Sequence, residues 1–246
     1  PERGRVAPHI FHDQEVIDLL AAARQIGPSG SIRPATYETL FGLMASAGLR
    51  VSEALHLRDA DVDLKRGLLT IRQTKFAKSR LLPVHPTTVV ALAKYRKARA
   101  RHVATTDDMP FLISSRGRRL GLPLGDRQAH RVFTGLRDSL GWINRGGHEA
   151  PRLHDLRHTF ATLALENGMD VKTLSAMLGH VSAATTLDIY THAFDKNKKA
   201  ASAGLQEMLE IEAFDEDTVN ELRIRAKNAL LTMEIAKEES VEETTQ

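Results

Sequence analysis

Apolar residues recur at helical spacing through most of residues 12–193, and this periodicity limits the fold more than any other feature of the chain. Residues three or four apart share one face of a helix, so each such segment predicts a helix with one buried side. The pattern predicts helices over 12–25, 35–47, 87–102, 126–140, 154–167, 170–178 and 182–193.

Small polar residues and glycines mark the ends of these helices. The expected end residues are Asp170 and Ser182 as N-caps, and Gly48, Gly168 and Gly179 as C-terminal stops. Ser52 is expected to cap a further short helix, and the aspartates at 59, 61 and 63 are expected to form a turn.

One stretch, GLLTIRQTKFAKSRLLPVH at 67–85, changes to alternation at Leu69 and Ile71 and again at Leu81, Leu82 and Val84. Alternation is typical of a half-buried strand, so this stretch predicts a hairpin with a basic connecting loop. The expected fold class is therefore mainly α with a small antiparallel β-sheet (α+β).

The charge of the chain is divided unevenly. Residues 201–246 carry 4 basic and 12 acidic side chains, which leaves 30 basic and 19 acidic side chains in residues 1–200. The net charge of +11 on residues 1–200 favours a polyanion partner, with nucleic acid the commonest.

The chain contains no cysteine, which excludes disulfides, thiolate metal sites and a cysteine nucleophile. No apolar run approaches the roughly 18 residues of a membrane span, and no signal peptide is visible. We therefore expect no membrane partner and a cytoplasmic location.

Six residues could together act on a phosphodiester. Two arginines can neutralise the phosphate, a lysine can protonate a leaving oxygen, histidines can move or orient protons, and a tyrosine can attack. These residues are Arg50, Lys75, His154, Arg157, His180 and Tyr190. None of this chemistry needs a metal or another cofactor, and we expect none.

Four motifs, GLRVSEALHL, TKFAKSRLLPV, HDLRHTFAT and LGHVSAATTLDIYTH, carry these residues in order. In this order the motifs resemble those of the tyrosine recombinase, or phage integrase, family. The resemblance covers about residues 1–200 and implies that family's catalytic-domain fold. It also implies site-specific DNA recombination, for integration or excision of a mobile element, without metal or ATP.

The resemblance also implies a role for each residue. Arg50 and Arg157 would hold the phosphate, Lys75 would be the general acid, and Tyr190 would form a 3′-phosphotyrosine intermediate. His154 would assist proton transfer, and His180 would hydrogen-bond the phosphate. Lys78 is a second candidate for the lysine role, and His158 is expected to be structural.

The resemblance further implies partners and domains. The partners would be double-stranded DNA and three further copies of the chain in a homotetramer, with accessory DNA-bending proteins as additional candidates. Residues 1–200 would form the catalytic domain, without the N-terminal core-binding domain that is usual in the family. Residues 201–246 would form an acidic helical extension with a disordered end, and about 206–240 resemble the acidic C-terminal repeat of the transcription factor NusA.

Three other functions share some of these features. The histidines of HDLRH could hold zinc, but Asp155 stands where a zinc peptidase has glutamate, and Arg157 would repel a cation. A helix-turn-helix regulator would explain the charge, with LGH as the turn, but not the placement of Tyr190 and Lys75. A type IB topoisomerase-like nicking-closing enzyme would use the same chemistry at one phosphate.

Overall fold

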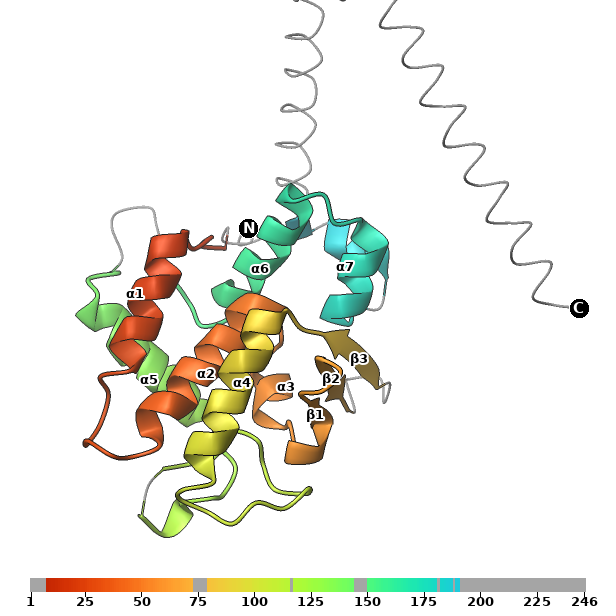
Figure 1. Cartoon of the computed structure of the whole chain (residues 1–246). Coiled ribbons are helices and arrows are strands. Elements are labelled where there is room, and N and C mark those ends of the chain that lie inside the picture. The colour runs from red at the N-terminus through yellow and green to blue at the C-terminus, as the bar shows by residue number, and fades with distance from the viewer. Residues whose placement is uncertain are drawn as a thin grey trace, which may run out of the picture. The chain divides into compact units, whose positions relative to one another are not determined.

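The structure of the protein is a computed structural model, and it describes residues 8–72, 79–115, 117–143, 150–180, 182–187 and 189–190. The helices are α1 (Asp13–Ala23), α2 (Arg33–Ala47), α3 (Val51–Leu55), α4 (Pro86–Arg99), α5 (Asp126–Ser139), α6 (Asp155–Glu166) and α7 (Val171–Leu178), and the strands are β1 (Val62–Asp63), β2 (Leu68–Ile71) and β3 (Arg80–Pro83) (Figure 1). Residues 183–187 and 189–190 are also helical, and short 3-10 helices occur at Asp59–Asp61 and Gly117–Arg119. The predicted fold class is confirmed.

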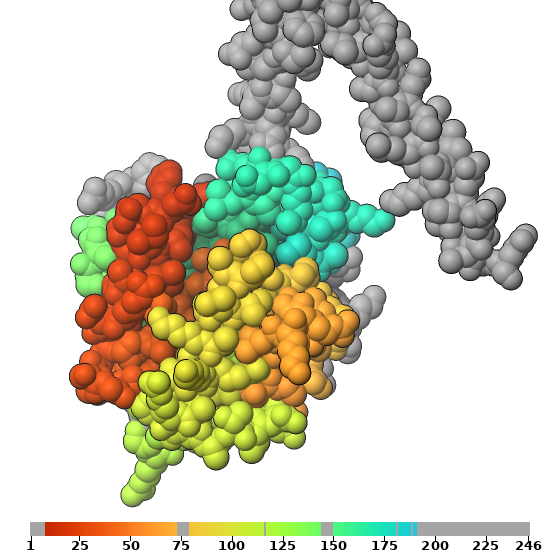
Figure 2. Space-filling view, viewed as in Figure 1, coloured from red at the N-terminus to blue at the C-terminus, as the bar shows by residue number. Residues whose placement is uncertain are grey.

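Helix α2 is the centre of the core, because α1, α3, α4 and α6 all contact it. Its buried side chains include Tyr37, Leu40, Phe41, Leu43 and Met44, which point to several sides of the helix. A helix that is apolar on several sides has to be covered by other elements. Figure 2 shows α1 and α4, in red and yellow, covering much of one face of the molecule.

The three strands form one antiparallel sheet in the order β1-β2-β3. Leu69 pairs with Leu82, and both side chains are buried together with Ile71, as the alternation predicted. Leu81 lies on the opposite face of β3 and is 63% exposed. Arg80, at the start of β3, pairs with Glu53 of α3 at 2.9 Å, so this end of the strand lies beside that helix.

Two local predictions were wrong. Ser52 is not an N-cap, because α3 begins at Val51 and the carboxylate of Glu53 accepts a hydrogen bond from the Arg50 N–H instead. The aspartates at 59, 61 and 63 do not form a simple turn, because Asp59–Asp61 is a 3-10 helix and Val62–Asp63 is strand β1. Arginines pair with the first two carboxylates of this segment: the buried Arg99 with Asp59, and the exposed Arg72 with Asp61.

The other helix ends agree with the predictions to within a few residues. Asp170 caps α7 by accepting a hydrogen bond from Thr173 N at 2.9 Å. Gly48 and Gly179 end α2 and α7 in the left-handed conformation, with φ of 63° and 65°.

Some predictions fall outside the described residues: the basic hairpin loop with Lys75 and Lys78, and everything from residue 191 onward, including the NusA-like segment. The predicted domain boundary at residue 200 therefore stays a prediction. Among the helices that the structure describes, none is long and apolar enough to cross a membrane.

We predict that Gly48→Ala strongly destabilises the protein. A Cβ built on Gly48 would lie 2.3 Å from Cδ1 of Phe160, and its φ of 63° strains an alanine whatever the space. The backbone strain and the overlap together should lower the free energy of unfolding by about 2–5 kcal/mol. Thermal unfolding should show a fall of about 5–15 °C in Tm.

Gly30→Ala is the matched control, because Gly30 has a φ of 77° but nothing within 4 Å of the added Cβ. That variant should lose only the backbone strain, about 1–2 kcal/mol. Equal losses in the two variants would contradict close packing between Gly48 and Phe160.

Candidate active site

The C-terminal end of α7 binds three arginines from three other parts of the chain. Its successive carbonyls each accept a hydrogen bond: Met177 O from Arg80 Nε at 2.9 Å, Leu178 O from Arg157 Nη2 at 2.8 Å, and Gly179 O from Arg50 Nη2 at 3.4 Å. The last carbonyls of a helix have no partner within the helix and lie at its negative end. They are therefore good acceptors for guanidinium groups.

Glu53, on α3, is the carboxylate of this cluster, and its side chain is 8% exposed. It accepts a bidentate pair of hydrogen bonds from Arg80 at 2.9 and 3.0 Å, and a further one from Arg50 Nη1 at 2.8 Å. Burial raises the pKa of Glu53, but the hydrogen bonds from Arg80 and Arg50 outweigh it, so the pKa lies below its ordinary value. Glu53 is therefore ionised at neutral pH.

Arg157, in the first turn of α6, is 2% exposed and is held by main-chain oxygens. Its Nη1 donates to Gly48 O at 2.6 Å, and its Nη2 donates to Leu178 O. Burial lowers the pKa of Arg157 to about 10, which leaves the guanidinium charged at neutral pH. The three arginines and the one glutamate, Glu53, together carry a net charge of +2.

His180 follows α7 directly and contacts the same arginine. Arg157 Nη2 lies 3.2 Å from His180 Nε2, and Thr186 Oγ1 lies 2.8 Å from His180 Nδ1. A guanidinium only donates, so Nε2 must accept and Nδ1–H must donate to the threonine hydroxyl. Burial first, and Arg157 next, lower the pKa of His180 to about 4, so the ring is neutral at pH 7.

His154 is the N-cap residue of α6, and its ring packs edge-on against His158 with 5.0 Å between centroids. Burial and the neighbouring His158 lower the pKa of His154 to about 4. Among the described residues, no group of three or more histidines, aspartates or glutamates is placed to hold a metal ion.

Tyr190 is 1% exposed, and its hydroxyl lies 3.0 Å from His158 Nδ1. Burial raises the pKa of Tyr190 to about 12, although Arg157 and Arg50 both lower it. The phenol is therefore protonated at neutral pH. It lies close enough to Arg157 and Arg50 for their positive charges to act on it.

The structure thus brings five of the six predicted residues into one region. Arg50, Arg157 and His180 meet at the end of α7, and His158 connects Tyr190 to His154. Lys75 lies outside the described residues, in the connection between β2 and β3.

The sequence patterns did not identify three further members of the site, which are Glu53, Arg80 and His158. Glu53 follows Arg50 at helical spacing, which is a signal for a pair. Arg80 and the buried Leu82 are two residues apart on β3, so both side chains lie on the inward face of the strand. An arginine at an inward position has to find an acceptor, and this could have indicated its role.

The chain is similar to known proteins over the part that contains this site. Residues 10–197 match the model of the phage integrase family. The integrase/recombinase y4rB of Sinorhizobium fredii is 39% identical over 197 residues, which are 76% of this chain and 61% of that protein. Tyrosine recombinase XerA of Pyrococcus furiosus is 30% identical over 201 residues, which are 82% of this chain and 63% of that protein.

Solved structures agree with these matches. A XerA recombinase crystal structure has a TM-score of 0.60 at 25% identity and covers 89% of this chain and 65% of that one. XerH recombinase bound to a palindromic difH substrate has a TM-score of 0.62 at 25% identity and covers 84% of this chain and 55% of that one. The chain spans about three fifths of the length of the curated relatives that it matches first.

We predict that Glu53→Gln destabilises the protein by about 3 kcal/mol at pH 7, because three guanidinium groups lose their buried counter-charge. The pKa of Glu53 is lowered by folding, so its stabilisation is present above its ordinary value of 4.5 and is lost as the pH falls below it. Denaturant unfolding should therefore show a constant difference in the free energy of unfolding between wild type and variant from pH 7 to about pH 5, and a smaller difference as the pH falls below 4.5.

Glu38→Gln is the control for this experiment. Glu38 pairs with Arg24 at 2.8 Å, but that arginine side chain is 53% exposed, so its loss should cost at most about 1 kcal/mol. A Glu53→Gln variant as stable as Glu38→Gln at pH 7 would contradict the role of Glu53 as the counter-charge.

Proposed function

The chain belongs to the phage integrase family, and on that premise we propose that it is a site-specific DNA recombinase that cuts and rejoins strands through Tyr190. The relatives support the class of reaction, since they are named as integrases and tyrosine recombinases. The net charge of +11 on residues 1–200 supports DNA as the substrate.

The observation that carries the proposal is the excess positive charge at the end of α7, close to a buried tyrosine. Arg50 and Arg157 are fixed by backbone oxygens and are not neutralised by Glu53 alone. Guanidinium groups bind phosphate oxygens well, and fixed ones stabilise charge that grows in a transition state without having to reorganise. A phosphodiester is therefore the ligand that best fits this cluster.

In the proposed reaction, the Tyr190 oxygen attacks the phosphorus, and the bond from phosphorus to the 5′-oxygen breaks. Lys75 supplies the proton that the departing 5′-oxygen takes up. The product is a 3′-phosphotyrosine, and a free 5′-hydroxyl from another strand reverses the steps. The phosphodiester bond energy is kept in the intermediate, so rejoining needs neither ATP nor a metal.

The proposed assembly follows from the family and not from the geometry. Exchange between two DNA sites requires four active sites, so we propose a homotetramer on DNA, aided by DNA-bending proteins. A DNA substrate also agrees with the cytoplasmic location that the sequence led us to expect. A regulator without catalysis would not need a buried tyrosine beside two fixed arginines.

We predict that the protein forms a covalent adduct with DNA in EDTA. The protein is mixed with a pool of nicked suicide duplexes, from which the short fragment with the new 5′-hydroxyl diffuses away, and the product is separated on a denaturing gel. Wild type should give a protein–DNA band, and Tyr190→Phe should give none, because it lacks the attacking oxygen.

DNA binding of both proteins, measured on the same pool, is the control. Binding without an adduct in the wild type would contradict the recombinase proposal and favour the regulator. An adduct that leads only to relaxation of supercoiled DNA, with no exchange between two sites, would favour a nicking-closing enzyme.

We predict that Arg50→Ala slows adduct formation about 10²–10³-fold, since it removes one fixed donor for the phosphate charge. Arg50→Lys should recover part of the rate, because it keeps the charge but loses the bidentate geometry.

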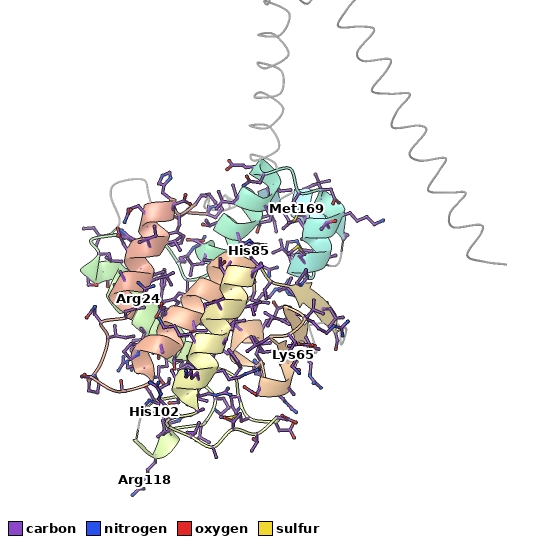
Figure 3. All side chains as sticks on the ribbon, viewed as in Figure 1. Arg24, Lys65, His85, His102, Arg118 and Met169 are labelled. Carbon is purple, nitrogen blue, oxygen red and sulfur yellow. The ribbon has the colours of Figure 1, made fainter. Side chains whose placement is uncertain are left out.

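Arg24→Ala is the control, because Arg24 lies at the C-terminal end of α1, away from α7, and forms an ion pair with Glu38 (Figure 3). That variant should keep adduct formation within a few-fold of wild type. An Arg50→Ala variant that cleaves as fast as Arg24→Ala would remove Arg50 from the site.

A further inference from the structure

We propose that His158 is a catalytic residue that accepts the hydroxyl proton of Tyr190 during DNA cleavage; this inference rests on the proposed function. The sequence led us to expect a structural role for His158. The geometry points elsewhere, because its Nδ1 lies 3.0 Å from the oxygen that would attack.

The two rings are held in place by the fold. The Tyr190 and His158 ring centroids are 5.6 Å apart, and Tyr190 is buried in the last described turn of the chain. His158 lies on α6, in the turn that also carries Arg157, so the proton acceptor and the phosphate-binding guanidinium share one rigid helix. A general base has to lie within hydrogen-bond reach of the proton that it removes, and His158 does.

The other two histidines of the site are less suited to this step. Burial lowers the pKa of His154 to about 4, so it is a weak base at neutral pH. The Nε2 of His180 accepts from Arg157, and its Nδ1 is engaged with Thr186.

The charges around His158 determine when it can take a proton. On its own helix, the neighbouring titratable groups are His154 and Arg157. Three other parts of the chain add charged or titratable groups near them: Arg50 and Glu53 at α3, Arg80 on β3, and His180 after α7. The arginines oppose a further positive charge on His158. A bound phosphodiester would offset that opposition, and a neutral His154 avoids a second charge on the paired rings.

The proton balance of the step is complete. The Tyr190 O–H bond breaks and its proton moves to His158 Nδ1, while the phenol oxygen forms the bond to phosphorus. The bond from phosphorus to the 5′-oxygen breaks, and that oxygen receives its proton from Lys75. In the return reaction the phenol oxygen leaves phosphorus and recovers its proton from His158.

His158→Asn is the variant that tests the proposal. The Asn amide places a hydrogen-bonding atom near the position of Nδ1 but cannot take a proton at neutral pH. Adduct formation on the nicked duplexes is measured under single-turnover conditions from pH 5 to pH 9. Wild type should accelerate as His158 loses its own proton and then level off, whereas His158→Asn should be about 10²–10⁴-fold slower and lack that inflection.

A duplex with a bridging 5′-sulfur separates this role from that of the general acid. A thiolate leaves without a proton because its conjugate acid is far stronger than an alcohol. The sulfur substrate should restore the rate of Lys75→Ala but leave His158→Asn slow. Restoration of His158→Asn by sulfur would overturn the proposal, because it would assign His158 to the leaving-group side.

His154→Asn is the matched comparison on the same helix face. It should be slower than wild type but keep the inflection in its pH profile, if His158 is the acceptor. An inflection lost in His154→Asn and kept in His158→Asn would assign the proton to His154 and overturn the proposal. Circular dichroism and DNA binding must match wild type for each variant that is compared.

A second measurement does not depend on replacing His158. With histidines labelled with ¹⁵N, Tyr190→Phe should shift the Nδ1 resonance of the ring that contacts the Tyr190 hydroxyl in wild type, and the absence of any shifted ring would overturn the contact. The failure of the proposed function is a different result: wild type would form no adduct at all. A wild type that forms the adduct beside an equally fast His158→Asn would overturn only the role of His158.

Discussion

The end of α7 binds guanidinium groups from the α2–α3 turn, from β3 and from α6, and the relative positions of these elements depend on those contacts. Hydrogen bonds to the carbonyls satisfy acceptors that would otherwise lack partners inside the protein. Burying several cations is costly, and one carboxylate, Glu53, offsets only part of that cost. The remaining positive charge favours an anion at the cluster, and the contacts that join the elements keep that charge in place.

Two glycines make this arrangement of carbonyls geometrically feasible. Gly48 and Gly179 both adopt positive φ, and each turns the chain so that its own carbonyl faces an arginine. A Cβ on Gly179 would lie 2.6 Å from Nη1 of Arg80, so it would displace this guanidinium from its position. The helix stops that the sequence predicts are therefore parts of the arginine cluster.

The sequence predicted the helices and the hairpin well, because apolar spacing reports directly which face of an element is buried. It did not predict β1, since a strand of two residues has no period to detect. A spacing of four residues places His154 and His158 on one face of α6, where their rings are in contact, but helical spacing cannot say which of them reaches Tyr190. That choice depends on a tertiary distance between residues 32 positions apart. Arg80 and Met177 are separated by 97 positions, and local patterns carry no information about such a pair.

The arginines of the site are held largely by main-chain oxygen atoms, at Gly48, Met177, Leu178 and Gly179. Replacement of a side chain does not remove a backbone carbonyl, so Met177 and Leu178 can change identity while the acceptor stays in place. Sequence drift around the cluster is then limited by packing and by the two glycines, and much less by hydrogen-bonding chemistry. An architecture supported in this way can tolerate extensive divergence, in keeping with a shared fold at 25% identity.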